Sequence, residues 1–154
     1  MTVDGKMEYK NIKRSFSEGY AILIEDHGFG PMDGGCLMFA KALRGTISDV
    51  LGKETELVVS GRGIIQDHFF VKVLSSRGDY YIDYEGIYRS KQAVTRQMID
   101  ELLPTGTRES ELTIRVITEE EEKGLVETED LIINENTVAK LKKVLSKSFN
   151  TDSF

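Results

Sequence analysis

The chain has 154 residues, of which 40% are hydrophobic and 30% charged, and its formal net charge at pH 7 is −6. This composition predicts one globular domain over residues 1–148 with a frayed tail over 149–154, and a single cysteine excludes an internal disulfide. The acidic balance argues against a nucleic-acid partner, because phosphate neutralisation needs clustered lysine and arginine. The N-terminal stretch lacks the apolar core of a signal peptide and no stretch is long enough to span a bilayer, so we expect a cytoplasmic protein without a membrane partner.

Two helices are predicted in the first third of the chain. Apolar residues at helical spacing over residues 9–24 predict the first helix, and a loop rich in glycine and acid follows over 25–31. The apolar run 37–43 predicts the second helix, which Gly45 is expected to end. Cys36 therefore falls in the first turn of this second helix.

Cys36 is the leading candidate for a reactive residue. The unpaired N–H groups and positive dipole end of a helix start favour an anion, so a thiolate forms there more easily than in water. Gly34 and Gly35 would let a substrate approach the backbone closely. The alternative is that Cys36 is a small core hydrophobe, as most lone cysteines are. His27 is either an oxyanion donor or second base near Cys36, or a solvated loop residue beside Asp26.

A β-hairpin is predicted about thirty residues further on. Residues 56–60 form one expected strand, and residues 68–73 alternate between apolar and polar side chains as a second. Residues 80–84 are the expected partner strand, and the connecting turn closes with Gly78 in the left-handed position.

The register of this hairpin brings His68 towards a carboxylate. With the turn just described, Phe70 faces Asp83 and His68 faces Glu85. Facing residues share one side of the sheet, and diagonal neighbours remain within reach of long side chains. We therefore expect His68 to meet Asp83 or Glu85, with Asp83 the better partner.

The rest of the chain predicts a helix, a strand and a final helix over residues 91–103, 112–118 and 137–149. Ser90 is expected to cap the first of these helices, and Asn134 or Asn136 the last. Together the elements indicate an α+β fold, with an antiparallel sheet of about four strands packed against the Cys36 helix.

Cys36, His68 and Asp83 follow one another in the order of a nucleophile, a base and an orienting group. The GGC helix start, the strand HFFVKV and the segment YYIDYEG resemble the catalytic core of papain-like and transglutaminase-like cysteine enzymes, including compact bacterial and phage members. The resemblance covers about residues 28–86. It implies a papain-like core with an N-terminal nucleophile helix, in which Cys36 attacks, His68 is the base and Asp83 holds the imidazole.

The expected activity is cysteine-dependent acyl transfer on an amide, ester or thioester, as in a thiol protease, amidase or deamidase. Peptides, proteins or small amides are the expected substrates, and Gly35 and His27 are secondary candidates near the oxyanion. No cofactor or metal is expected, because the His, Cys and Asp residues near Cys36 lack a recognised zinc spacing. The alternative is an inactive papain-like accessory or binding protein, for instance a viral one, that acts through protein–protein contacts. The resemblance implies an oxyanion-hole glutamine a few residues upstream of the cysteine, as in the papain branch. Its absence here and the acidic surface favour this alternative.

Overall fold

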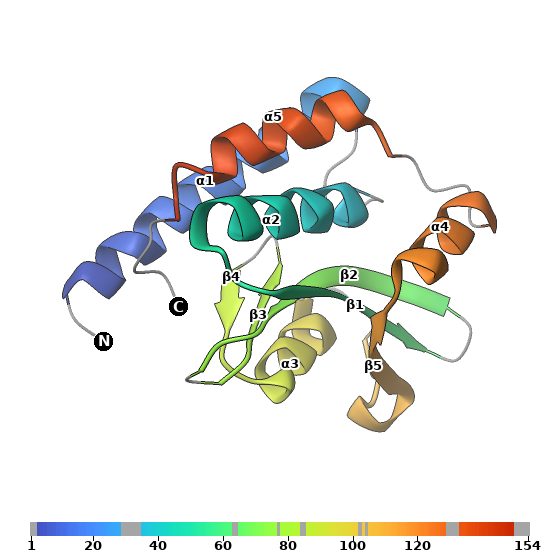
Figure 1. The fold of residues 1–154 in the computed structure, drawn as a ribbon. Helices are drawn as coiled ribbons and strands as arrows, with labels where there is room; N and C mark the ends of the chain where they lie inside the picture. Colours follow the sequence, from blue (N-terminus) through green and yellow to red (C-terminus); the bar gives the residue numbers. More distant parts are fainter. Residues whose placement is uncertain are drawn as a thin grey trace.

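The computed structural model describes residues 3–28, 35–62, 65–76, 78–83, 86–101, 103, 105–128 and 133–149. Over these residues the chain is an α+β structure with one antiparallel sheet of five strands in the order β4-β3-β2-β1-β5 (Figure 1). The strands are β1 Thr55–Arg62, β2 Ile65–Val73, β3 Tyr80–Asp83, β4 Gly86–Tyr88 and β5 Leu112–Ile117. The short strand β4 was not predicted, and it accounts for the sheet having five strands where about four were expected.

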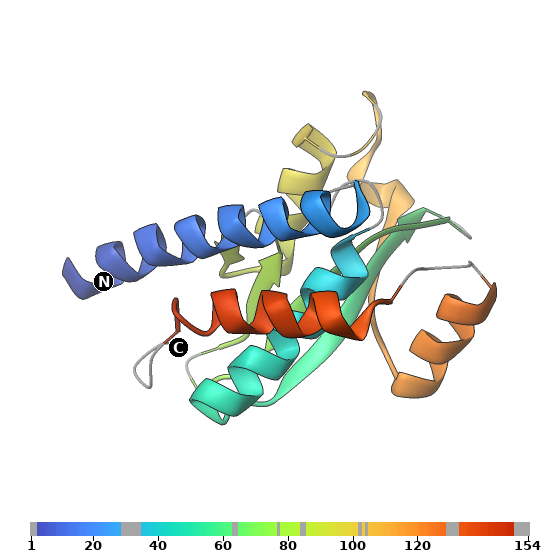
Figure 2. The same ribbon diagram turned by 90° about the horizontal axis from the view of Figure 1, so that it is seen from above.

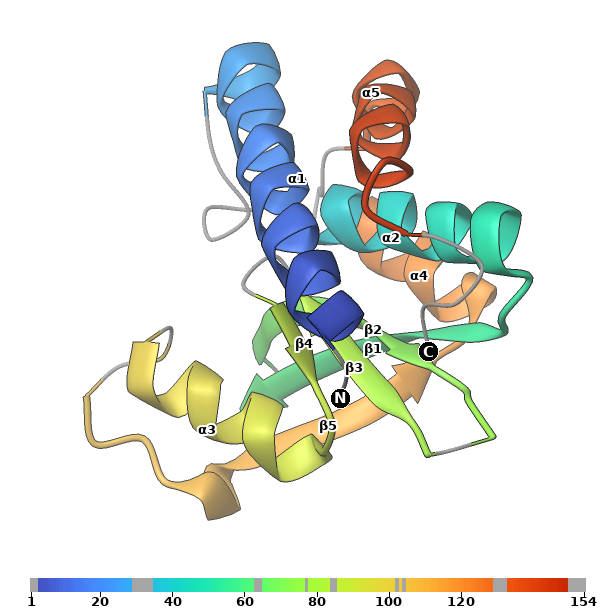
Figure 3. The ribbon, with the colours of Figure 1, turned by 90° about the vertical axis from the view of Figure 1, so that its left-hand side faces the viewer.

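The helices are α1 Val3–His27, α2 Cys36–Leu51, α3 Lys91–Glu101, α4 Glu119–Thr128 and α5 Glu135–Leu145. Helices α1, α2 and α5 lie over one face of the sheet, and α3 lies on the opposite face (Figures 1 and 3). Seen from above, α1 and α5 run side by side and α5 crosses over α2 (Figure 2). In the described part of the chain, every helix is too short or too polar to cross a membrane.

Two hydrophobic clusters, one on each face of the sheet, follow from the two-residue alternation of the strands. The larger cluster joins one face of the sheet to α1, α2 and α5, and includes Val59, Val71 and Ile82. In the smaller cluster, Val58 and Phe70 pack against α3 on the other face. Adjacent residues of β1 and β2 are therefore buried on opposite faces, which explains why the centre of each strand carries consecutive apolar residues, Leu57–Val59 in β1 and Phe69–Val71 in β2.

The prediction that Gly45 ends the second helix is wrong. Helix α2 continues to Leu51 and ends at Gly52, which has a left-handed backbone with φ of 63°. Gly45 lies where the side chain of Lys142 from α5 passes, and a Cβ at this position would come within 2.8 Å of the Lys142 Cε atom. Its lack of a side chain therefore reflects a helix crossing and not a helix end.

The predicted tail begins too early. Ser148 and Phe149 follow α5 and are both buried, and Phe149 belongs to the larger hydrophobic cluster. Phe149 is 4% exposed, and burial of its aromatic ring anchors the segment after α5 to the hydrophobic cluster. Residues 150–154 lie outside the described residues.

The predicted helix caps are present. The Ser90 hydroxyl accepts a hydrogen bond from the Ala93 amide at the start of α3. The Asn134 side chain accepts hydrogen bonds from the amides of Asn136 and Thr137 at the start of α5. Each cap satisfies amide groups that the first helical turn leaves unpaired.

Candidate active site

The pairing of β2 with β3 has the register predicted from the sequence. Val71 lies opposite Ile82 and Val73 opposite Tyr80. The Gly78 amide donates to the Ser75 carbonyl at 3.1 Å, and Gly78 has φ of 117° in the positive region expected for the turn. Continued by one residue, this register sets Phe70 opposite Asp83. Glu85, the other carboxylate considered for His68, lies outside the described residues.

His68 and Asp83 form a buried pair just beyond the last residues of the β2–β3 ladder. The His68 Nε2 atom lies 3.2 Å from Asp83 Oδ2, and the two residues are only 1% and 3% exposed. Because a carboxylate can only accept, Nε2 carries the proton of this hydrogen bond. The His68 ring also stacks on Phe70, with 5.6 Å between ring centroids and 23° between the ring planes. These contacts hold the imidazole in one orientation.

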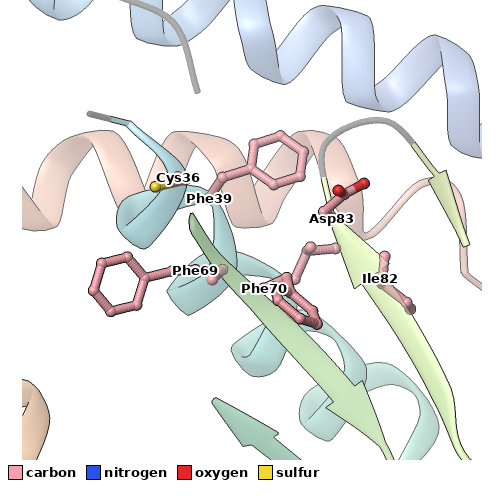
Figure 4. Close-up of a pocket in the computed structure, with 8 residues that line it drawn as sticks. Cys36, Phe39, Phe69, Phe70, Ile82 and Asp83 are labelled. Atoms are coloured by element: carbon pink, nitrogen blue, oxygen red, sulfur yellow. The ribbon is translucent and has the colours of Figure 1, made fainter. Parts of the chain in front are cut away.

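Cys36 is the first residue of α2 and follows Gly35, which is the N-cap and offers no side chain to cap the helix. It is partly exposed, whereas the next four residues of the helix are buried. Cys36 lies close enough to His68 to contribute to the rise of its pKa. Figure 4 shows Cys36 at the start of α2 and Asp83 at the end of β3. The fold therefore brings all three predicted site residues together.

The electrostatics of the site favour a charged imidazole. Burial by itself lowers the pKa of His68, but hydrogen bonds to Asp83 and Cys36 and the negative charges of these two groups outweigh it, raising this pKa to about 9. His68 is thus expected to be an imidazolium at neutral pH.

The space beside Cys36 is small and apolar. A concavity of about 160 Å³, part of it open to solvent, leaves no interior room for a water molecule. It is lined by Cys36, Phe39, Ala40, Leu43, Phe69, Phe70, Ile82 and Asp83 (Figure 4). Residues 29–34 and 84–85, which adjoin Cys36 and Asp83 along the chain, lie outside the described residues. Among the described residues, the concavity therefore leaves no space for a water molecule against Asp83.

His27 lies at the C-terminal end of α1, not in the loop where it was expected, because α1 continues to this residue. The Thr137 hydroxyl donates to Asp26 Oδ2 at 2.8 Å, so His27 Nε2, 2.9 Å from the same hydroxyl oxygen, acts as the donor to it. Lys140 also donates to both oxygens of Asp26. These contacts tie α1 to α5, and they support a structural role for His27 in place of an oxyanion role.

Two contacts of the site were not predicted from the sequence. The Gly86 amide donates to Asp83 Oδ1 at 3.2 Å, which occupies the carboxylate oxygen that does not face His68. Phe70 stacks on His68, a contact that the two-residue period of β2 could have suggested because residues two apart share a face. Within the described residues, no group of three or more His, Cys, Asp or Glu side chains is arranged to hold a metal ion.

Comparison of the chain with models of protein families, with curated proteins and with solved structures finds no match.

Proposed function

We propose that this chain is a papain-like cysteine enzyme that catalyses acyl transfer on an amide, ester or thioester carbonyl. Cys36 is the nucleophile, His68 the base and Asp83 the residue that orients the imidazole. The observation that carries the proposal is the buried His68–Asp83 hydrogen bond beside a partly exposed cysteine at a helix start. The substrate class is a peptide, a protein or a small amide.

The two nitrogens of His68 have separate tasks in this reaction. Nε2 donates to Asp83, so Nδ1 is the nitrogen that takes the proton from the Cys36 thiol. The sulfur attacks the carbonyl carbon and forms an acyl–sulfur bond, while the leaving amine, alcohol or thiol receives the proton from Nδ1. Water or an amine then attacks the acyl-enzyme and restores the thiol.

The start of α2 supplies the oxyanion donor in this proposal. The first N–H groups of a helix have no acceptor within the helix, and the N-cap Gly35 carries no side chain to cap them. The backbone N–H of Cys36 is thus suited to donate to the negative oxygen of the tetrahedral intermediate. The helix dipole adds to this stabilisation, because its positive end lies at the same place.

Alkylation by iodoacetamide across a range of pH tests the activated cysteine. Cys36 is the only thiol, so the mass of the intact protein reports its reaction alone. With a thiolate–imidazolium pair, we expect alkylation at about pH 6.5 to be at least about tenfold faster than in His68→Gln. His27→Gln is the matched control, because it changes the only other histidine and is expected to react like the unmodified protein. Identical pH profiles for the unmodified protein and His68→Gln would reject the proposal.

A second candidate function is binding without catalysis, in an accessory protein that keeps the papain-like core. It is favoured by the concavity beside Cys36, whose apolar walls leave no interior room for a water molecule. A protein partner would then contact the surface around α2 without reacting with Cys36. Full biological activity of Cys36→Ser would support this second function, and loss of activity with binding retained would support the enzyme.

A further inference from the structure

Both oxygens of the Asp83 carboxylate accept a hydrogen bond from a different donor. Oδ2 accepts from His68 Nε2, and Oδ1 accepts from the Gly86 amide, each at 3.2 Å. Asp83 and Gly86 are also partners in the antiparallel ladder of β3 and β4, and both are buried. This ladder therefore sets the direction of the Gly86 N–H relative to the carboxylate.

We propose that the Gly86 amide is a positioning group that makes the carboxylate of Asp83 irreplaceable by the isosteric amide of asparagine. The inference rests on the proposed function, because the location of the His68 proton matters only if His68 is the base for Cys36. It adds the requirement that position 83 carries a carboxylate, which the proposed function alone does not contain.

The reason lies in the donors and acceptors of an asparagine at position 83. A backbone N–H can only donate, so the Gly86 amide needs an acceptor and binds the side-chain oxygen of the asparagine. The side-chain NH₂ then points towards His68. Nε2 must then accept, and the proton of the neutral ring moves to Nδ1. Nδ1 is the nitrogen that receives the Cys36 proton in the proposed reaction, so the base is blocked.

The opposite orientation of the amide is disfavoured. With its oxygen on His68, the asparagine would direct its NH₂ at the Gly86 N–H, and two buried donors would face each other without an acceptor. Asp83 and Cys36 are the groups that raise the pKa of His68, one from β3 and one from α2. Loss of the Asp83 charge removes one of these two groups. The pKa of His68 then falls, which further favours the neutral ring.

Nitrogen-15 NMR of the imidazoles tests this inference directly. The chain has two histidines, and the His27 signals are assigned by their loss in His27→Gln. We expect His68 of the unmodified protein to keep its Nε2 proton as the ring titrates. In Asp83→Asn we expect a neutral ring at pH 7 with its proton on Nδ1, and alkylation of Cys36 as slow as in His68→Gln.

Asp79→Asn is the matched control, because it makes the same chemical change just before β3. The Asp79 side chain is 43% exposed and pairs with Lys72. We expect this variant to show the His68 tautomer and the Cys36 alkylation rate of the unmodified protein.

An Nε2 proton on the neutral His68 ring of Asp83→Asn would overturn the inference, because the asparagine oxygen would then face His68. The proposed function would survive that result. Alkylation that does not depend on His68 in the unmodified protein would instead remove the proposed function, whatever the tautomer in Asp83→Asn.

A measurement on the unmodified protein covers the case in which Asp83→Asn does not fold. A scalar coupling across the hydrogen bond, between the Gly86 amide nitrogen and the Asp83 carboxyl carbon, is expected together with slow exchange of the Gly86 amide hydrogen. A missing coupling with fast exchange would overturn the inference.

Discussion

His68 combines two properties that conflict for an isolated imidazole. It is buried, which disfavours charge, and it is held between Asp83 and Cys36, which favours charge strongly enough to raise its pKa to about 9. Cys36 remains partly exposed beside it. In the proposed function, this arrangement makes His68 the base and the partly exposed Cys36 the nucleophile.

Acylation by p-nitrophenyl acetate checks the site residue by residue. We expect a burst of about one equivalent of nitrophenolate, with one acetyl group added to Cys36 in the intact mass. Cys36→Ser and His68→Gln are expected to lower the burst rate by about 100-fold, because the first removes the nucleophile and the second the base. His27→Gln is expected to stay within about twofold of the unmodified protein. An equal rate in Cys36→Ser would show that the ester reacts elsewhere.

At the scale of elements, the position of α2 depends on close contacts with α1 and α5. A Cβ added to Gly19 of α1 would lie 3.0 Å from Phe39 of α2 and 3.2 Å from Leu141 of α5. Phe39 in turn packs edge-on against Phe16, with ring centroids 5.3 Å apart, and lines the concavity beside Cys36. Gly19 therefore allows the close helix packing that positions the start of α2.

The same substitution at two helical glycines is expected to have opposite effects. Alanine favours a helix interior by about 1 kcal/mol over glycine. In Gly19→Ala, overpacking against Phe39 and Leu141 costs about 2 kcal/mol, so the free energy of unfolding falls by about 1 kcal/mol. In Gly45→Ala, only the flexible end of Lys142 has to move, at a cost of about 0.5 kcal/mol for its exposed ion pair with Asp49, so stability rises by about 0.5 kcal/mol.

Urea denaturation of both variants measures this difference. The two glycines lie in helices α1 and α2, so helix propensity is matched and only the neighbouring atoms differ. Equal changes in the free energy of unfolding would contradict the packing assigned to Gly19.

At the scale of the whole molecule, the site lies where several layers meet. The sheet has one hydrophobic cluster under α1, α2 and α5 and another under α3. His68 belongs to β2, in the interior of the sheet order, and Cys36 belongs to a helix that packs on one face. The burial that keeps water from the His68–Asp83 pair is therefore a property of the complete fold.

The stability of the protein is expected to fall as the pH rises through the His68 titration. The pKa of His68 is about 9 in the folded state against 6.5 for an unperturbed histidine, so the folded state binds its proton more tightly. Its contribution is fully present below pH 6.5 and is lost as the pH rises through about 9. The linked change in the free energy of unfolding is on the order of 3 kcal/mol.

Urea denaturation at several pH values in this window checks the linkage. His68→Gln is the control, because this variant keeps Cys36 but lacks the imidazole. We expect the free energy of unfolding to change much less with pH in this variant. A parallel dependence in the two proteins would show that another group causes the loss of stability.

The local pattern of the sequence was sufficient for much of this structure. Two-residue alternation and a glycine turn predicted the register of β2 and β3, because turn geometry and strand period are determined by neighbouring residues. The order of Cys36, His68 and Asp83 predicted which side chains the fold brings together. Helix caps at Ser90 and Asn134 were predicted for the same reason, since a cap contacts only the first turn of its own helix.

Contacts between distant segments were decided only by the tertiary structure. Gly45 is a helix-stop signal by itself, yet it lies within α2, where its missing side chain leaves room for Lys142, almost a hundred residues later. Phe149 belongs to a polar C-terminal stretch, yet it is buried because a cluster built from α1, α2 and the sheet accepts it. The same holds for the charge of His68. Its pKa depends on burial and on partners from α2 and β3, and no local pattern specifies how closely separate elements pack.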